Sequence, residues 1–121
     1  DKVNARRRHN ASLYHELLDP LHVFMPPERK IEHNTWHTFV IQIERREALK
    51  AWLAEKGIET AVHYPVPLHL QPAAIELGYR EGDMPETERQ AARILTLPVN
   101  QFLKDEDIEF VANAVNRFFA A

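Results

Sequence analysis

Residues 36–64 read WHTFVIQIERREALKAWLAEKGIETAVHY, and this stretch decides the fold class. Near its start, Phe39, Ile41 and Ile43 alternate with the residues of the opposite face, which is typical of a strand with one buried side. His37 lies earlier in the same alternation, so we expect it on the buried face at the edge of the core. Residues 36–43 therefore predict a strand.

The rest of this stretch predicts a helix followed by a second strand. Residues 47–56 place apolar side chains at helical spacing, and Gly57 follows where a left-handed C-terminal cap is expected. Residues 58–64 return to a strand pattern. A strand, a helix and a strand in succession normally cross over right-handed within one sheet, so we expect a mixed α/β layer.

Further elements are predicted on both sides of this unit. Residues 3–18 carry an apolar stripe and predict a long helix, while the proline-containing polar stretch 26–34 predicts an exposed connection. Downstream, short helices near 73–77 and 84–93, a short strand at 94–97 and a last helix from residue 105 are expected. We therefore expect a small two-layer α/β domain at residues 26–121, with a mixed sheet of about three to four short strands under helices. A leading helix and connection at residues 1–25 would precede it.

Composition excludes several function classes. The 121 residues have a formal net charge of −3, so no strong field favours nucleic acid or anionic lipid, and we expect neither partner. The three glycines are too scattered for a phosphate-binding loop, and the only serine, Ser12, lies within the first predicted helix, which argues against a serine hydrolase. Absence of cysteine is compatible with a cytoplasmic protein. The chain begins Asp1-Lys2 without methionine and enters a helical pattern at once, so we expect a piece of a longer protein.

The seven histidines are the most unusual feature of the composition. His37, His63 and His69 could meet at the ends of the two predicted strands, so a histidine-based metal site is one interpretation. Against it, no histidine pair has i, i+4 spacing on a predicted helix and there is no HExxH motif. His63 and Tyr64 end a predicted strand and lead into a loop with several prolines that carries His69, where open α/β folds place ligands. Ligand binding and plain packing both remain open for these residues.

Several ordered segments carry a resemblance to a known family. The central one is HYPVPLHLQP at residues 63–72, and the others are RRR at 6–8, WHTFVI at 36–41, GIET at 57–60, LGY at 77–79, GDMP at 82–85 with Glu88, and LTLP at 95–98. Together they closely resemble the DegT/DnrJ/EryC1/StrS family of sugar aminotransferases across essentially the whole chain.

This resemblance implies the C-terminal small domain of a homodimeric fold-type-I enzyme, whose large domain holds pyridoxal phosphate on a lysine. Such an enzyme would transfer an amino group from an amino acid, commonly glutamate, to a keto group of a nucleotide-linked sugar for lipopolysaccharide, other cell-surface polysaccharide or amino-sugar synthesis. By the same resemblance, His63, Tyr64, His69 and His37 would line the substrate side of the cleft and bind, without transferring protons.

The resemblance also implies what this chain lacks. No segment resembles the lysine region, the carboxylate that pairs with the pyridine nitrogen, or the phosphate-binding turn of the large domain. Because the protein must orient and tune this cofactor, we expect no catalytic residue in the chain and no activity from the chain alone. Two other members of the same family remain alternatives: a non-catalytic regulatory protein and a sugar dehydratase.

Overall fold

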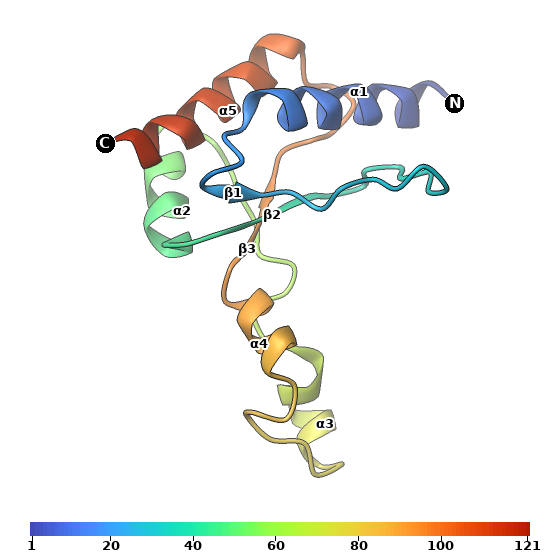
Figure 1. Cartoon of the computed structure of the whole chain (residues 1–121), viewed down its shortest axis with the longest axis vertical. Helices are drawn as coiled ribbons and strands as arrows, with labels where there is room; N and C mark the ends of the chain where they lie inside the picture. Colours follow the sequence, from blue (N-terminus) through green and yellow to red (C-terminus); the bar gives the residue numbers. More distant parts are fainter.

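The computed structural model describes all residues, 1–121. In order, the elements are α1 (Lys2–Leu17), β1 (Val23–Phe24), β2 (Phe39–Ile43), α2 (Arg46–Glu55), the 3-10 helix η1 (Leu68–Leu70), α3 (Pro72–Ile75), α4 (Pro85–Ala91), β3 (Ile94–Leu97) and α5 (Asp105–Ala120). In Figure 1, α1 and α5 lie side by side above the strands, and the segment from η1 to α4 projects away from them. The predicted α/β class and long N-terminal helix are confirmed.

The sheet has the order β1-β2-β3 and is antiparallel throughout, so the expected mixed sheet is wrong. Val23 pairs with Ile43, and Phe39 pairs with Leu97. The predicted strand at residues 58–64 reduces to a single antiparallel bridge between Ala61 and Thr96. Since this segment and β2 both run antiparallel to β3, they run parallel to each other with β3 between them.

Two local features explain why residues 58–64 do not form a full strand. Gly57 has φ +73°, and the Ile58 N–H donates to Leu53 O at 3.0 Å, so the first residues complete the C-terminal cap of α2. Two prolines, Pro65 and Pro67, then follow and cannot donate to a ladder. Between the helix cap at Gly57 and the first of these prolines, only one β-bridge forms, at Ala61.

Buried apolar residues from α1, the sheet, α2 and α5 form one hydrophobic cluster. Its members include Tyr14, Phe39, Ile41, Leu53 and Ile108, all at most 1% exposed. Each large side chain of this kind contributes roughly 1.5–3 kcal/mol through burial. The cluster joins residues from both of the predicted parts, 1–25 and 26–121, and the division between these parts stays a prediction.

His37 does not lie on the buried face that the alternation predicted. Trp36 has φ +51°, which interrupts extended backbone, and β2 begins only at Phe39. Trp36 itself is buried, but the His37 side chain is exposed. The strand pattern was therefore extended too far toward the N-terminus.

The projecting segment, residues 63–90, is called the arm below (Figure 1). Its only buried residue is His69, whereas Leu68 and Leu77 are 77% and 78% exposed. The arm therefore has no apolar core of its own. None of the helices, in the arm or in the rest of the chain (called the body below), combines the length and apolarity needed to cross a membrane.

Candidate functional site

The candidate site is a cavity of about 650 Å³ where the arm meets the sheet. One wall is the proline-containing loop with Tyr64 and Leu68, another is α4 with Gln90, and the floor comes from Val40 of β2 and Ile94 of β3. No Lys, Arg, Asp or Glu lines it. Such a wall can offer apolar contacts and neutral hydrogen-bonding groups to a ligand.

His63 and Tyr64, two of the residues predicted to bind a ligand, both line this cavity. His63 Nδ1 lies 2.9 Å from the Thr96 hydroxyl oxygen, and Thr96 is buried on β3. This contact fixes the imidazole ring and leaves Nε2 as the nitrogen available to a ligand. The Tyr64 ring is 70% exposed and lies edge-on to the His63 ring with 5.5 Å between centroids.

Thr96 was not singled out from the sequence. In the pattern ILTL at residues 94–97 it reads as one position of a short strand, although a hydroxyl within an apolar run is a weak signal for a buried polar contact. In the structure Thr96 is 9% exposed, and its backbone also forms the bridge with Ala61. It therefore fixes both the chain leading to His63 and the His63 ring.

His69 does not line the cavity. Its ring is 4% exposed, and Nε2 lies 2.9 Å from Glu88 Oε1 on α4. The hydrogen bond from His69 is the main cause that lowers the pKa of Glu88 below its usual range.

His37 lies apart from the other three predicted site residues. Its Nδ1 is 3.2 Å from an Arg7 guanidinium nitrogen on α1, and it does not line the cavity. The structure therefore brings His63 and Tyr64 together at the cavity and places His69 and His37 elsewhere. It contains no group of three or more His, Asp and Glu side chains arranged to hold a metal ion.

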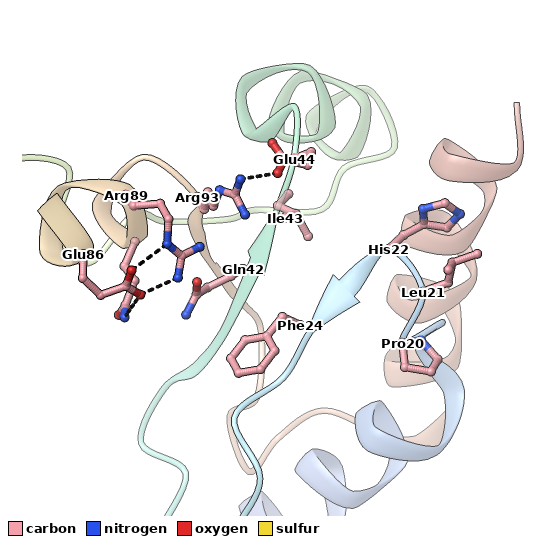
Figure 2. A pocket seen from close by; sticks show the side chains of 11 residues that line it. Pro20, Leu21, His22, Phe24, Gln42, Ile43, Glu44, Glu86, Arg89 and Arg93 are labelled. Carbon is pink, nitrogen blue, oxygen red and sulfur yellow. Dashed lines mark hydrogen bonds and ion pairs between the residues drawn. The ribbon is translucent and has the colours of Figure 1, made fainter.

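A second, open pocket of about 440 Å³ lies between β1, β2 and α4 (Figure 2). Arg93 pairs with Glu44, and Arg89 pairs with Glu86, whose pKa falls to about 2 because it accepts hydrogen bonds from Arg89 and Gln90. Since each arginine has its own carboxylate, the pocket offers no uncompensated positive charge to an anion. It is a weaker candidate than the cavity at His63 and Tyr64.

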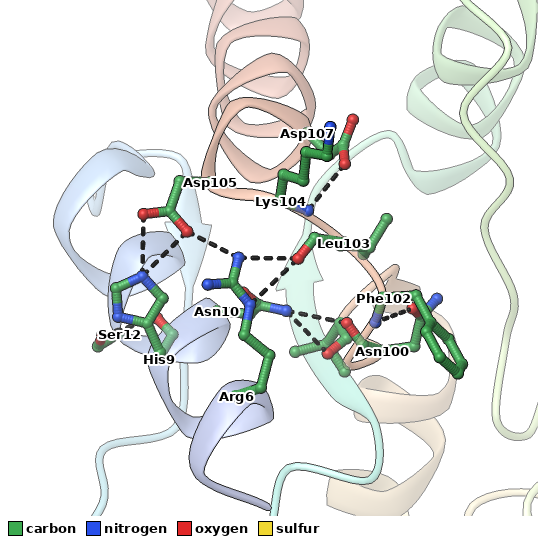
Figure 3. Close-up of polar contacts among 11 residues, drawn as sticks. Arg6, His9, Asn10, Ser12, Asn100, Phe102, Leu103, Lys104, Asp105 and Asp107 are labelled. Atoms are coloured by element: carbon green, nitrogen blue, oxygen red, sulfur yellow. Dashed lines mark hydrogen bonds and ion pairs between the residues drawn. The ribbon is translucent and has the colours of Figure 1, made fainter. Parts of the chain in front are cut away.

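A polar cluster joins α1 to the start of α5 (Figure 3). Arg6 donates to Leu103 O at 2.8 Å and to Asp105 at 2.7 Å, and His9 Nε2 lies 3.1 Å from both oxygens of Asp105. These bonds, from His9 first and Arg6 second, lower the pKa of Asp105. Because Arg6 and His9 hold α1 to the start of α5, this cluster is structural.

The residues present do not form a pyridoxal phosphate site by themselves. An aldimine needs a lysine facing the bound cofactor, and no lysine lines either the cavity or the open pocket. Lys56, for example, lies over the Trp52 ring, 3.2 Å from its centroid. Neither pocket therefore contains a residue to which pyridoxal phosphate could be covalently attached.

Comparison with known proteins gives relatives across nearly the whole chain. A "Pleiotropic regulatory protein" of Geobacillus stearothermophilus is 38% identical over 98% of this chain and 33% of the relative. The dTDP-3-amino-3,6-dideoxy-alpha-D-galactopyranose transaminase of Aneurinibacillus thermoaerophilus is 34% identical over 98% of this chain and 32% of the relative.

Among solved structures, S. venezuelae DesV in complex with a ketimine intermediate matches with a TM-score of 0.91 and 34% identity, over 96% of this chain and 32% of that one. A DegT DnrJ EryC1 StrS aminotransferase from Brucella abortus matches with a TM-score of 0.88 and 30% identity, over 98% of this chain and 32% of that one. The chain thus spans about a third of the length of the relatives it matches. A family model also matches residues 1–116, and the chain belongs to the DegT/DnrJ/EryC1/StrS aminotransferase family.

Proposed function

We propose that this chain is the C-terminal small domain of a pyridoxal-phosphate-dependent aminotransferase that acts on a nucleotide-linked sugar. The full-length protein would be a cytoplasmic homodimer that transfers the amino group of an amino acid, glutamate in this proposal, to a keto group of the sugar. Its product would enter cell-surface polysaccharide, lipopolysaccharide or amino-sugar synthesis. Within that enzyme, this chain supplies one wall of the substrate cleft.

The observation that carries this proposal is the cavity at HYPVPLHLQP, a segment within the residues that match the family model, where His63 and Tyr64 are exposed. Relatives named as transaminases of dTDP-linked amino sugars and of a UDP-linked N-acetylglucosamine derivative support a nucleotide-sugar substrate. The DesV structure with its ketimine intermediate supports amino-group chemistry.

The lining of the cavity indicates which part of such a substrate it would contact. Tyr64 offers an aromatic face, while His63, Gln71 and Gln90 offer hydrogen-bonding groups. Without a lysine or arginine, this wall suits the sugar or the base, and the charge of the diphosphate would be met by residues outside this chain. Its chemical roles are to bind the substrate, to orient it and to exclude water.

Cofactor labelling tests whether the chain has an aldimine lysine of its own. After incubation with pyridoxal phosphate and reduction with borohydride, we expect mass spectrometry to show either no adduct or substoichiometric labelling scattered over exposed lysines. The same treatment of the urea-unfolded chain provides the control for intrinsic lysine reactivity. A single stoichiometric adduct on one lysine of the folded chain would show an autonomous cofactor site and contradict the assignment to a small domain.

Ligand titration tests the proposed wall directly. On addition of dTDP-glucose or UDP-N-acetylglucosamine, we expect amide NMR shifts confined to residues that line the cavity. Tyr64→Ala should weaken binding at least fivefold, about what loss of an aromatic stacking contact costs.

Phe102→Ala is the matched control, because Phe102 is an 85% exposed aromatic residue that does not line the cavity. If neither sugar nucleotide shifts the cavity residues, or if the two alanine variants bind alike, the cavity is not the substrate wall.

A regulatory role is the second candidate, favoured by the name of the Geobacillus relative. The aminotransferase and its two alternatives, the regulatory protein and the sugar dehydratase, differ at the aldimine position, which lies in the part of the family that this chain does not match. A lysine there in the full-length coding sequence supports the aminotransferase, and a histidine supports a sugar dehydratase. Any other residue supports the non-catalytic protein.

A further inference from the structure

We infer that His69 and Glu88 form a polar strut that holds the proline-containing loop against α4 and thereby positions the two walls of the cavity. His69 is in this sense a positioning residue, since its ring does not line the cavity. The strut concerns the shape of the cavity and rests on the proposed function only for the identity of the ligand.

The geometry of the strut joins three segments of the arm. His69 lies on η1, and its Nε2 is 2.9 Å from Glu88 Oε1 on α4. The backbone N–H of Gly82 donates to the same carboxylate, at 2.8 Å to Oε1 and 3.1 Å to Oε2. One carboxylate therefore ties η1, the turn at Gly82 and α4 together.

The arm has little else that could fix these segments. His69 is the only buried residue between Glu59 and Gln90, and no buried apolar side chain lies in that span. His63 contacts Thr96 and so ties the start of the arm to β3, while the remaining side-chain hydrogen bonds of the arm are local, such as those of Glu86 with Arg89 and Gln90 on the same helix. Because the arm has no hydrophobic core, the hydrogen bonds of Glu88 with His69 and Gly82 hold η1, the turn at Gly82 and α4 together.

The hydrogen bonds available to the His69 ring determine which of its nitrogens carries the hydrogen that faces Glu88. An ionised carboxylate only accepts, so His69 Nε2 must carry the hydrogen. His69 Nδ1 is buried without a partner, so the contact with Glu88 is the only hydrogen bond of this ring. The geometry therefore directs the Nε2 hydrogen toward the Glu88 carboxylate.

His69 and Glu88 are close in sequence to residues that line the cavity. Leu68 precedes His69 in the chain and Gln71 follows shortly, whereas Thr87 and Gln90 flank Glu88 on α4. Loss of the strut would let the loop and α4 separate. The exposed Tyr64 would then lose its defined distance from Gln90.

Matched variants test the strut in the full 121-residue chain. His69→Leu should speed hydrogen exchange of the Gly82 amide about tenfold or more, the effect expected for losing a hydrogen bond to a charged group. It should also broaden the NMR signals of Tyr64 and Leu68. His69→Gln keeps a donor near the position of Nε2 and should restore slow exchange and sharp signals.

Glu88→Ala removes the strut from the other side and should give the same changes, with no further effect in the double variant. Glu86→Gln is the control on the same helix, and exchange of the Ile41 amide reports the body in every variant. The inference is overturned if His69→Leu leaves Gly82 and Tyr64 unchanged, or if His69→Gln behaves like His69→Leu. These readouts need no ligand, so they remain decisive even if dTDP-glucose fails to bind the wild-type chain.

Discussion

Replacing Tyr14 with alanine is expected to lower the free energy of unfolding by about 3–5 kcal/mol, the range for removing a large aromatic side chain from a core. Tyr14 is fully buried, and its ring lies 4.8 Å from the Phe39 ring between centroids. Its hydroxyl donates to Pro98 O at 2.6 Å. One side chain thus joins α1 to β2 and to the segment after β3.

Tyr14→Phe separates the two contributions. It keeps the ring and leaves the Pro98 carbonyl without its donor, so we expect a smaller loss of about 1–3 kcal/mol in urea denaturation. Burial raises the pKa of Tyr14 well above its usual range. The wild type should therefore lose stability above about pH 10, where the Tyr14 hydroxyl ionises only in the unfolded chain. This pH-dependent loss should be absent in Tyr14→Phe. Equal losses for Ala and Phe would contradict a core role for the ring.

The elements with a strong period could be predicted from the sequence. Ile108, Val111 and Val115 have helical spacing and are all buried, and α5 begins at the predicted residue, Asp105. β2 keeps the predicted alternation from Phe39 to Ile43. In both cases one face packs against the core along its whole length, so the pattern of burial follows the pattern of the sequence.

Elements that depend on their neighbours could not be predicted in the same way. Residues 58–64 have strand composition, yet cap formation at Gly57 and the prolines after Tyr64 leave one bridge. In α1, Val3 is 45% exposed although it belongs to the apolar stripe, while the polar Asn10 is fully buried. In these cases the neighbouring elements, and not the polarity of the residue itself, determine whether it is buried or paired in a strand.

The candidate site was predictable in its position and less so in its parts. The sequence predicts a ligand site at HYPVPLHLQP, and in the structure His63 and Tyr64 of this segment line one cavity. The sequence does not indicate that the His69 side chain is buried against α4, because η1 is a short turn and the contact with Glu88 lies 19 residues further along the chain. Thr96 was missed because the histidine that it holds is distant in sequence.

Replacing the buried Asn10 with aspartic acid, which exchanges the amide nitrogen for an oxygen, is expected to give the second large loss in the free energy of unfolding. Its Nδ2 donates to Asn100 O at 2.9 Å and faces Val99 O at 3.4 Å (Figure 3). Asn10→Asp places a carboxylate against these two carbonyl oxygens in a site with no solvent exposure. Burial and the loss of both donors must raise the pKa of the new carboxyl in the folded state.

We therefore expect Asn10→Asp to cost about 4 kcal/mol at pH 7, the free energy needed to keep an aspartic acid with an unfolded pKa near 3.9 protonated. A carboxyl whose folded pKa is raised destabilises above its unfolded pKa. The difference from wild type should accordingly grow by about 1.4 kcal/mol per pH unit between roughly pH 4 and pH 7.

Asn10→Leu is the control, because it removes the amide donor of Asn10 without adding an ionisable group. Its cost should be about 1–3 kcal/mol and independent of pH. Urea denaturation of the three proteins at pH 4, 5.5 and 7 measures these differences directly. A pH-independent cost for Asn10→Asp would mean that water reaches the new carboxylate, and that the joint between α1 and the segment before α5 is open where the structure shows it closed.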